Sequence, residues 1–170
     1  MQGVMELELV FYNDDFKQQL DNYTITDDQL RFTGHPDEAI ALAKDDPERH
    51  PVVAVRHGWI TNFFVLHEKN GARPYTSHPH AILLRTFSTD FHQQGKGYAR
   101  QCLKQLPHFV RTHFPEIEQM VLGVNTENVA AQNLYRQAGF VDEGGRMFGK
   151  KGELIIMHYH LGKEGIYRWK

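Results

Sequence analysis

One stretch of this sequence constrains the fold more than any other: an apolar run that passes through a glycine loop into a helix. The run His80–Ser88 carries apolar side chains on both of its faces, with Ala81, Leu83 and Phe87 on one and Ile82, Leu84 and Thr86 on the other. This pattern indicates a central strand that is covered on both sides. From Gly97 onward, apolar residues recur at helical spacing as far as Val110. We therefore expect a sheet with this helix packed against it.

The rest of the pattern supplies further strands and helices. Strands are expected at Met5–Tyr12, Pro51–His57, Trp59–His67, Gln119–Val124, Phe140–Arg146 and Leu154–His160, and helices at Asp14–Tyr23, Pro36–Asp45 and Asn128–Ala138. Pro107 lies inside the helix that follows Gly97, so a kink or an early end is expected there. The order β-α-α-β-β-β-α-β-α-β-β predicts a mixed central sheet flanked by helices, of the α/β or α+β class.

Bulk composition narrows the range of functions. The chain has 170 residues, a net charge of -2 and one cysteine. These values suit a single domain, here placed at residues 1–161 with a C-terminal tail at 162–170, and they argue against a nucleic-acid partner. Glu6 and Glu8 interrupt the apolar start, and no apolar run is long enough to cross a membrane. We predict a cytoplasmic protein, and both a monomer and a homodimer remain open.

The segment Gln94–Ala99 carries the first chemical signal. It joins the buried strand to the helix, and a helix N-terminus offers unpaired amides that bind phosphate. Gly95 and Gly97 would let a pyrophosphate approach the backbone. A plain strand-to-helix turn explains the same residues equally well. Arg100 stands where the dinucleotide fingerprint requires glycine, and no Gly-Lys-Ser/Thr triplet is present, so two common phosphate motifs are excluded.

A second block decides between these readings. Asn125–Phe140 contains Asn125, Asn128, Ala131, Leu134-Tyr135 and Gly139-Phe140, in the run NTENVAAQNLYRQAGF. Together with Gln94–Ala99, which fits the motif Gln/Arg-x-x-Gly-x-Gly/Ala, this block resembles the GNAT superfamily of N-acetyltransferases. The resemblance at motif level covers about Ala81 to Phe140. Residues 26–34 are also faintly similar to bacterial polyamine acetyltransferases.

The resemblance implies acetyl-CoA as acyl donor, no metal, and a defined set of site residues. It implies that the central strand splays from its neighbour and admits the thioester beside the backbone of Phe87, Ser88 and Thr89. It also implies that the backbone of Gln94, Gly95, Lys96, Gly97, Tyr98 and Ala99 holds the pyrophosphate. Asn128 would contact the cofactor from the second block.

Tyr135 matches the position at which the family often has a general acid. A phenol with a pKa near ~10 can give its proton to a departing thiolate. Without the resemblance, a core tyrosine on a helix face is the better interpretation. The general base is not identified, and Glu68, His67, His78 and His80 are each expected to be solvated loop or edge residues.

Four other features have plain alternatives. The pairs His78/His80 and His158/His160 could each share a strand face and bind a metal, but exposed or packed histidines are the simpler interpretation. Cys102 is expected in the core. Arg85 could pair with a carboxylate, face the acyl channel or extend from a strand end to solvent. Asp27 and Asp28 could attract a cationic amine or cap a helical turn, and we favour the cap.

The sequence therefore predicts an enzyme that moves an acetyl group directly from acetyl-CoA to an amine. A small cationic amine is the candidate acceptor, with neither nucleic acid nor membrane as partner. The alternative is a non-catalytic module that binds or senses acyl-CoA, which would keep the glycine loop but need no proton donor.

Overall fold

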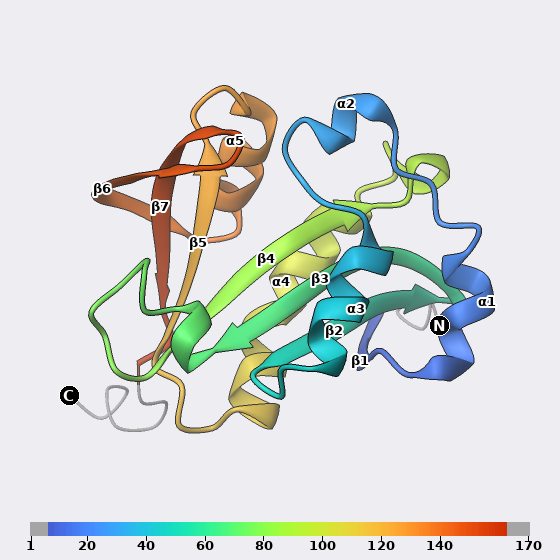
Figure 1. Cartoon of the computed structure of the whole chain (residues 1–170), viewed down its shortest axis with the longest axis horizontal. Coiled ribbons are helices and arrows are strands. Elements are labelled where there is room, and N and C mark those ends of the chain that lie inside the picture. The colour runs from blue at the N-terminus through green and yellow to red at the C-terminus, as the bar shows by residue number, and fades with distance from the viewer. Residues whose placement is uncertain (1–6, 163–170) are drawn as a thin grey trace.

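The computed structural model describes residues 7–162, which contain one seven-stranded sheet (Figure 1). The strand order is β1-β2-β3-β4-β5-β7-β6, and all neighbours are antiparallel except β4 and β5. The mixed sheet flanked by helices is confirmed. Met5 and Glu6 of the first predicted strand, and all but Gly162 of the predicted tail, lie outside the described residues.

The strands agree closely with the sequence pattern. They are β1 Glu8–Phe11, β2 Arg49–Arg56, β3 Trp59–Glu68, β4 Ala81–Thr89, β5 Gln119–Asn125, β6 Val141–Gly149 and β7 Gly152–His160. The helices are α1 Lys17–Leu20, α2 Asp27–Leu30, α3 Pro36–Lys44, α4 Tyr98–His113 and α5 Val129–Gln137, with 3-10 turns η2 Asp14–Phe16, η3 Lys69–Gly71 and η4 Phe91–Gln93.

Two helical predictions need correction. The segment predicted to start at Asp14 is a 3-10 turn followed by the single-turn α1, and its cap is Asn13, whose side chain accepts from the Asp15 amide. Helix α4 does not end early, because it continues through the buried Pro107 to His113. The apolar stripe of α4 packs on the sheet on both sides of Pro107, and this burial maintains the helix despite the missing amide hydrogen bond.

Helices cover both faces of the sheet (Figure 1). The larger core lies between the sheet and α4 with α5, and it includes Phe64, Leu103 and Met120. On the opposite face, a second cluster joins α1 and α3 to β2 and β3. A third, small cluster lies on that same opposite face around Leu83 and Val121, beneath the loop that follows η3.

A β-bulge in β4 reverses its faces partway along. Thr86 has a φ of 55°, and the register with β3 shifts at this point. Ile82 and Leu84 share a face, as predicted, and this face packs against α4. Phe87 also packs into the α4 core, so its predicted placement with Ala81 and Leu83 is wrong. An extra residue in one strand moves every later side chain to the other face. Positive φ at a β-branched residue is strained, and such strain is concentrated at functional sites.

Strands β4 and β5 separate soon after they begin. Their parallel pairing covers only Ala81–Leu83 against Gln119–Val121, although both strands continue well beyond it. Figure 1 shows the two strands diverging from this point. Beyond Leu83, β4 pairs with β3 but not with β5, and the sheet opens between its two halves.

Gly71 provides a first prediction on stability. A Cβ built at Gly71 would lie 2.1 Å from the His67 ring, which is only 4% exposed. Gly71→Ala is expected to lower the free energy of unfolding by about 2 kcal/mol, because the buried ring has no room to move. Urea unfolding measures this, with Gly34→Ala as control, since its Cβ would meet nothing closer than 4.0 Å. Equal stability of the two variants would contradict the described packing.

Candidate functional site

The glycine loop has the geometry that close approach of a phosphate requires. Gly95 and Gly97 have φ values of 79° and 83°, and a Cβ on either would meet no atom within 4 Å. Gly97 is the N-cap of α4. Gln94 to Gly97 are exposed, while Tyr98 and Ala99 are half-buried at the start of the helix. The first amides of a 16-residue helix thus follow an open loop with no side chain over its glycines.

The end of β4 divides its side chains between the two faces. Phe87 turns toward α5, whereas the Ser88 hydroxyl lies 2.9 Å from the Tyr23 hydroxyl on the opposite side. Thr89 Oγ1 accepts from Asn62 Nδ2, and its carbonyl accepts from Gln29 Nε2 at 2.8 Å. Ser88 and Thr89 therefore attach β4 to its surroundings through hydrogen bonds, whereas the Phe87 ring packs into the core beneath α4 and α5.

Tyr135 lies beside Phe87, across the separation between the two half-sheets. Its ring centroid is 6.3 Å from that of Phe87 and 5.9 Å from that of Phe140, both edge to face. Within residues 7–162, no protein group hydrogen-bonds its hydroxyl. Burial raises the pKa of Tyr135, and nearby Cys102 adds to this, so the phenol keeps its proton over the neutral range.

Cys102 is fully buried, as predicted for a core residue. Burial raises the pKa of its thiol, which removes the thiolate form that nucleophilic catalysis needs. The chemistry of this site therefore depends on a group other than Cys102.

Asn128 caps α5 rather than extending toward the glycine loop. Its Oδ1 accepts from the Ala131 amide at 3.2 Å, and its own amide donates to the Asn125 carbonyl. No described hydrogen bond joins Asn128 to the loop. The structure thus brings Phe87 and Tyr135 together and leaves Asn128 at the other end of α5.

The histidines considered as bases occupy different environments. His78 and His80 lie in the loop before β4 instead of on a strand, and Glu68 bonds His50 at 2.8 Å. His67 was expected at a solvated edge, but it is buried, because η3 folds back over its ring. Of the two i, i+2 pairs, only His158 and His160 share a strand face, with nearly parallel rings.

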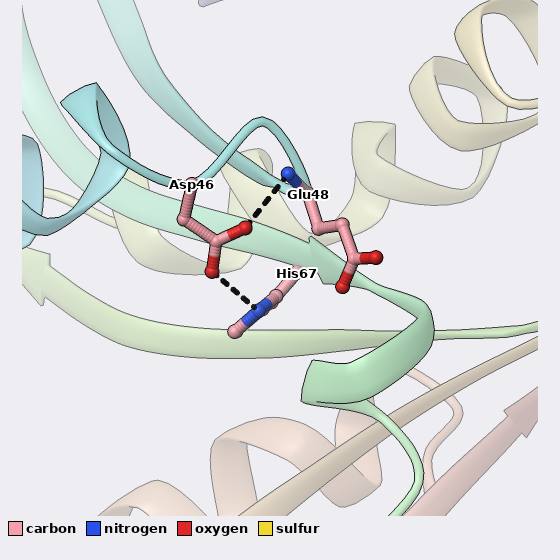
Figure 2. A group of neighbouring side chains, drawn as sticks. All are labelled: Asp46, Glu48 and His67. Atoms are coloured by element: carbon pink, nitrogen blue, oxygen red, sulfur yellow. Dashed lines mark hydrogen bonds and ion pairs between the residues drawn. The ribbon is translucent and has the colours of Figure 1, made fainter.

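Asp46, Glu48 and His67 form a cluster with the ligand types of a metal site (Figure 2). Arg85 Nη1 lies 3.2 Å from His67 Nδ1. A guanidinium can only donate, so Nδ1 accepts and the proton of the neutral ring is on Nε2. That Nε2–H points toward Asp46 Oδ2 at 3.5 Å, where a metal would need a lone pair. With Nδ1 engaged by Arg85, the imidazole has no lone pair free for a metal, and its Nε2–H approaches Asp46 without forming a hydrogen bond.

The helical turn expected at Asp27 and Asp28 is present as α2, Asp27–Leu30, but its cap is Thr26 and not either aspartate. Thr26 and Gln29 form a capping box that starts α2, with Asp27 and Asp28 in its first turn. Lys151, in the β6–β7 turn, donates to the carbonyls of Leu30 and Thr33. The spacing Thr-x-x-Gln is a known capping signal and could have identified Thr26 as the cap. These contacts join the two half-sheets above the point where β4 and β5 separate.

Three comparisons place this geometry among known proteins. The sequence model of the Acetyltransferase (GNAT) family matches residues 2–140. An uncharacterized N-acetyltransferase of Bacillus subtilis, YbbJ, is 36% identical over 157 residues, which are 92% of this chain and 98% of YbbJ.

Solved structures share the fold. The aminoglycoside acetyltransferase AAC(6')-Ib, in complex with paromomycin and acetyl-CoA, has a TM-score of 0.74 at 15% identity, over 91% of this chain and 93% of the other. The spermidine N-acetyltransferase of Vibrio cholerae, with CoA and spermine, has a TM-score of 0.64 at 18% identity, over 92% and 96%.

No helix within residues 7–162 combines the length and apolar composition that crossing a bilayer requires.

The family match covers most of the chain, and the sequence relative covers nearly all of it. The chain therefore belongs to the acetyltransferase (GNAT) family, and the predicted enzyme class, an N-acetyltransferase that uses acetyl-CoA as its acyl donor, is confirmed.

Proposed function

We propose that this enzyme acetylates a small primary amine, with residues 1–161 acting as one catalytic domain and Tyr135 as the general acid. One observation carries the proposal: a tyrosine with an unbonded hydroxyl lies beside Phe87 where β4 has left β5. Two of the solved structures that share the fold hold small amines, namely an aminoglycoside and spermine. These neighbours make a small-molecule acceptor the natural candidate here.

The donor would lie along three parts of the chain. The exposed backbone of Gln94–Ala99 would hold the pyrophosphate, supported by the dipole of α4. The backbone near Phe87, unpaired on the β5 side, would hydrogen-bond the pantetheine and polarise the thioester carbonyl. For Asn128, whose side-chain oxygen is already engaged in the cap, we propose the remaining amide group as the cofactor contact.

The chemistry needs one proton removed and one supplied. The neutral amine attacks the thioester carbon, a C–N bond forms, and the C–S bond breaks. The nitrogen loses its extra proton to water, and the leaving sulfur takes a proton from the Tyr135 hydroxyl. Because burial raises the pKa of Tyr135, the proton donor persists at alkaline pH.

The test is release of the CoA thiol from acetyl-CoA across a panel of small amines. We expect thiol release that depends on the amine and rises with pH, because only the unprotonated amine is a nucleophile. The rise should follow the acceptor's own pKa and shift when the acceptor is changed, with no fall from Tyr135 ionisation below about pH 10. Tight acetyl-CoA binding without thiol release for any amine would favour the non-catalytic binding module instead.

A further inference from the structure

Arg85 is a half-buried cation that no described carboxylate neutralises. Within residues 7–162, the protein contact to its guanidinium is the 3.2 Å hydrogen bond to His67 Nδ1. Burial lowers the pKa of Arg85 and Arg49 adds to this effect, while Tyr75 opposes it. A guanidinium offers five N–H donors, and His67 takes one of them. Arginines in such surroundings are usually paired, so the remaining donors point to a ligand.

The position of Arg85 connects it to the site. It lies on β4 between Leu83, the last residue paired with β5, and the bulged Thr86. Arg85 lies opposite Val65 of β3, and its contact with His67 puts its side chain on the face away from α4. Tyr75 packs near Gly123 of β5 and interacts electrostatically with Arg85. The guanidinium therefore lies close to where β4 and β5 separate, on the face opposite α4.

Two residues behind Arg85 fix its orientation. His67 accepts from Arg85 through Nδ1. Its Nε2 faces Asp46 Oδ2 at 3.5 Å (Figure 2). The Asp46 carboxylate is itself held by the Glu48 amide at 3.0 Å and by Arg49 Nε at 3.2 Å. Gly71 packs against the imidazole and leaves it no other position. His67 and Asp46 are thus positioning residues that hold a cation in place before any ligand arrives.

We propose that Arg85 binds a carboxylate of the acceptor, so that the enzyme acetylates amino-acid-like amines that carry a carboxylate near the reacting nitrogen. The proposal rests on the proposed function and adds to it that the acceptor meets β4 from the face opposite α4, where the Arg85 side chain lies. One guanidinium presents a two-pronged donor face that matches one carboxylate. Such an acceptor is zwitterionic, so its carboxylate would contact the positively charged Arg85 although its amine is also cationic before it reacts.

Matched pairs of acceptors test this proposal. Each pair consists of an amino acid and the amine formed by removing its carboxylate, such as lysine and 1,5-diaminopentane, or methionine and 3-(methylthio)propylamine. Removing the carboxylate also raises the pKa of the neighbouring amine, so kcat/KM is calculated on the concentration of the unprotonated amine. On that basis we expect kcat/KM to be at least about tenfold higher for the amino acid of a pair, in line with charge-assisted hydrogen bonds. In Arg85→Gln the ratio should fall toward one, mainly through the KM of the amino acid. Arg85→Lys should keep part of the ratio, because lysine retains the positive charge but not the paired N–H donors of the guanidinium.

Arg73→Gln is the control, since Arg73 is an exposed arginine of the neighbouring loop and should leave the ratio unchanged. Equal kcat/KM within the pairs of the parent enzyme, or a ratio that survives Arg85→Gln, overturns the proposal while leaving acetyl transfer intact. Calorimetric titration of the same amino acids into the complex of the enzyme with CoA measures their binding alone, because CoA has no acetyl group to transfer. Absence of carboxylate-dependent binding there overturns the role of Arg85 even if no amine is acetylated.

Discussion

Tyr135→Phe is expected to lower kcat by about 10²-fold, the usual range for removal of a general acid. The ring contacts to Phe87 and Phe140 do not involve the hydroxyl, so packing and the affinity for acetyl-CoA should remain nearly unchanged. Steady-state thiol release measures kcat, and calorimetric titration measures acetyl-CoA affinity. The loss should be greatest where protonation of the leaving sulfur limits the rate.

Tyr159→Phe is the matched control for this experiment. Tyr159 also packs edge to face against Phe140, at 5.5 Å, but it lies on β7 and does not contact Phe87. Removing its hydroxyl should leave kcat within about twofold of the parent value. Equal kcat for Tyr135→Phe and the parent would return Tyr135 to a purely structural role on the face of α5.

The sequence predicted the strand, glycine loop and helix of the site because each has a local signal. Apolar residues on both faces mark β4, the 3.6-residue period marks α4, and two glycines mark the turn between them. The resemblance added Tyr135, whose local pattern alone suggested a core tyrosine. Its neighbour Phe87 could be located along the chain but not assigned to the correct face.

Long-range packing explains what could not be predicted. The bulge at Thr86 exists because β3 and β4 change register, and no residue type in this strand signals it. His67 was expected to be solvated because it ends a strand, but the chain from Lys69 to Gly71 covers it. The pairing of Arg85 with an imidazole depends on a cross-strand neighbour eighteen residues away. Such contacts are set by the tertiary fold, which single-residue patterns do not encode.

Gly97→Glu is expected to abolish binding of acetyl-CoA. In the parent, a donor concentration 100-fold above Kd should stabilise the folded protein by about 2.7 kcal/mol, because the ligand binds only the folded state. A glutamate at the N-cap of α4 would place a carboxylate against the pyrophosphate and occupy the open space over the loop. Thermal unfolding with and without acetyl-CoA measures the loss of this stabilisation.

The variant also carries backbone strain, since Gly97 has a φ of 83°, and lower stability alone would not identify a binding defect. Gly58→Glu separates the two effects. Gly58, in the β2–β3 turn, has a φ of 82°, and a Cβ there would also meet no atom within 4 Å. Both substitutions therefore impose similar strain and the same charge change, but only Gly97 lies in the glycine loop.

We expect both variants to be less stable without ligand, and acetyl-CoA to raise the melting temperature of Gly58→Glu alone. If Gly97→Glu is stabilised as much as Gly58→Glu, the pyrophosphate binds elsewhere, and the role proposed for Gln94–Ala99 is wrong.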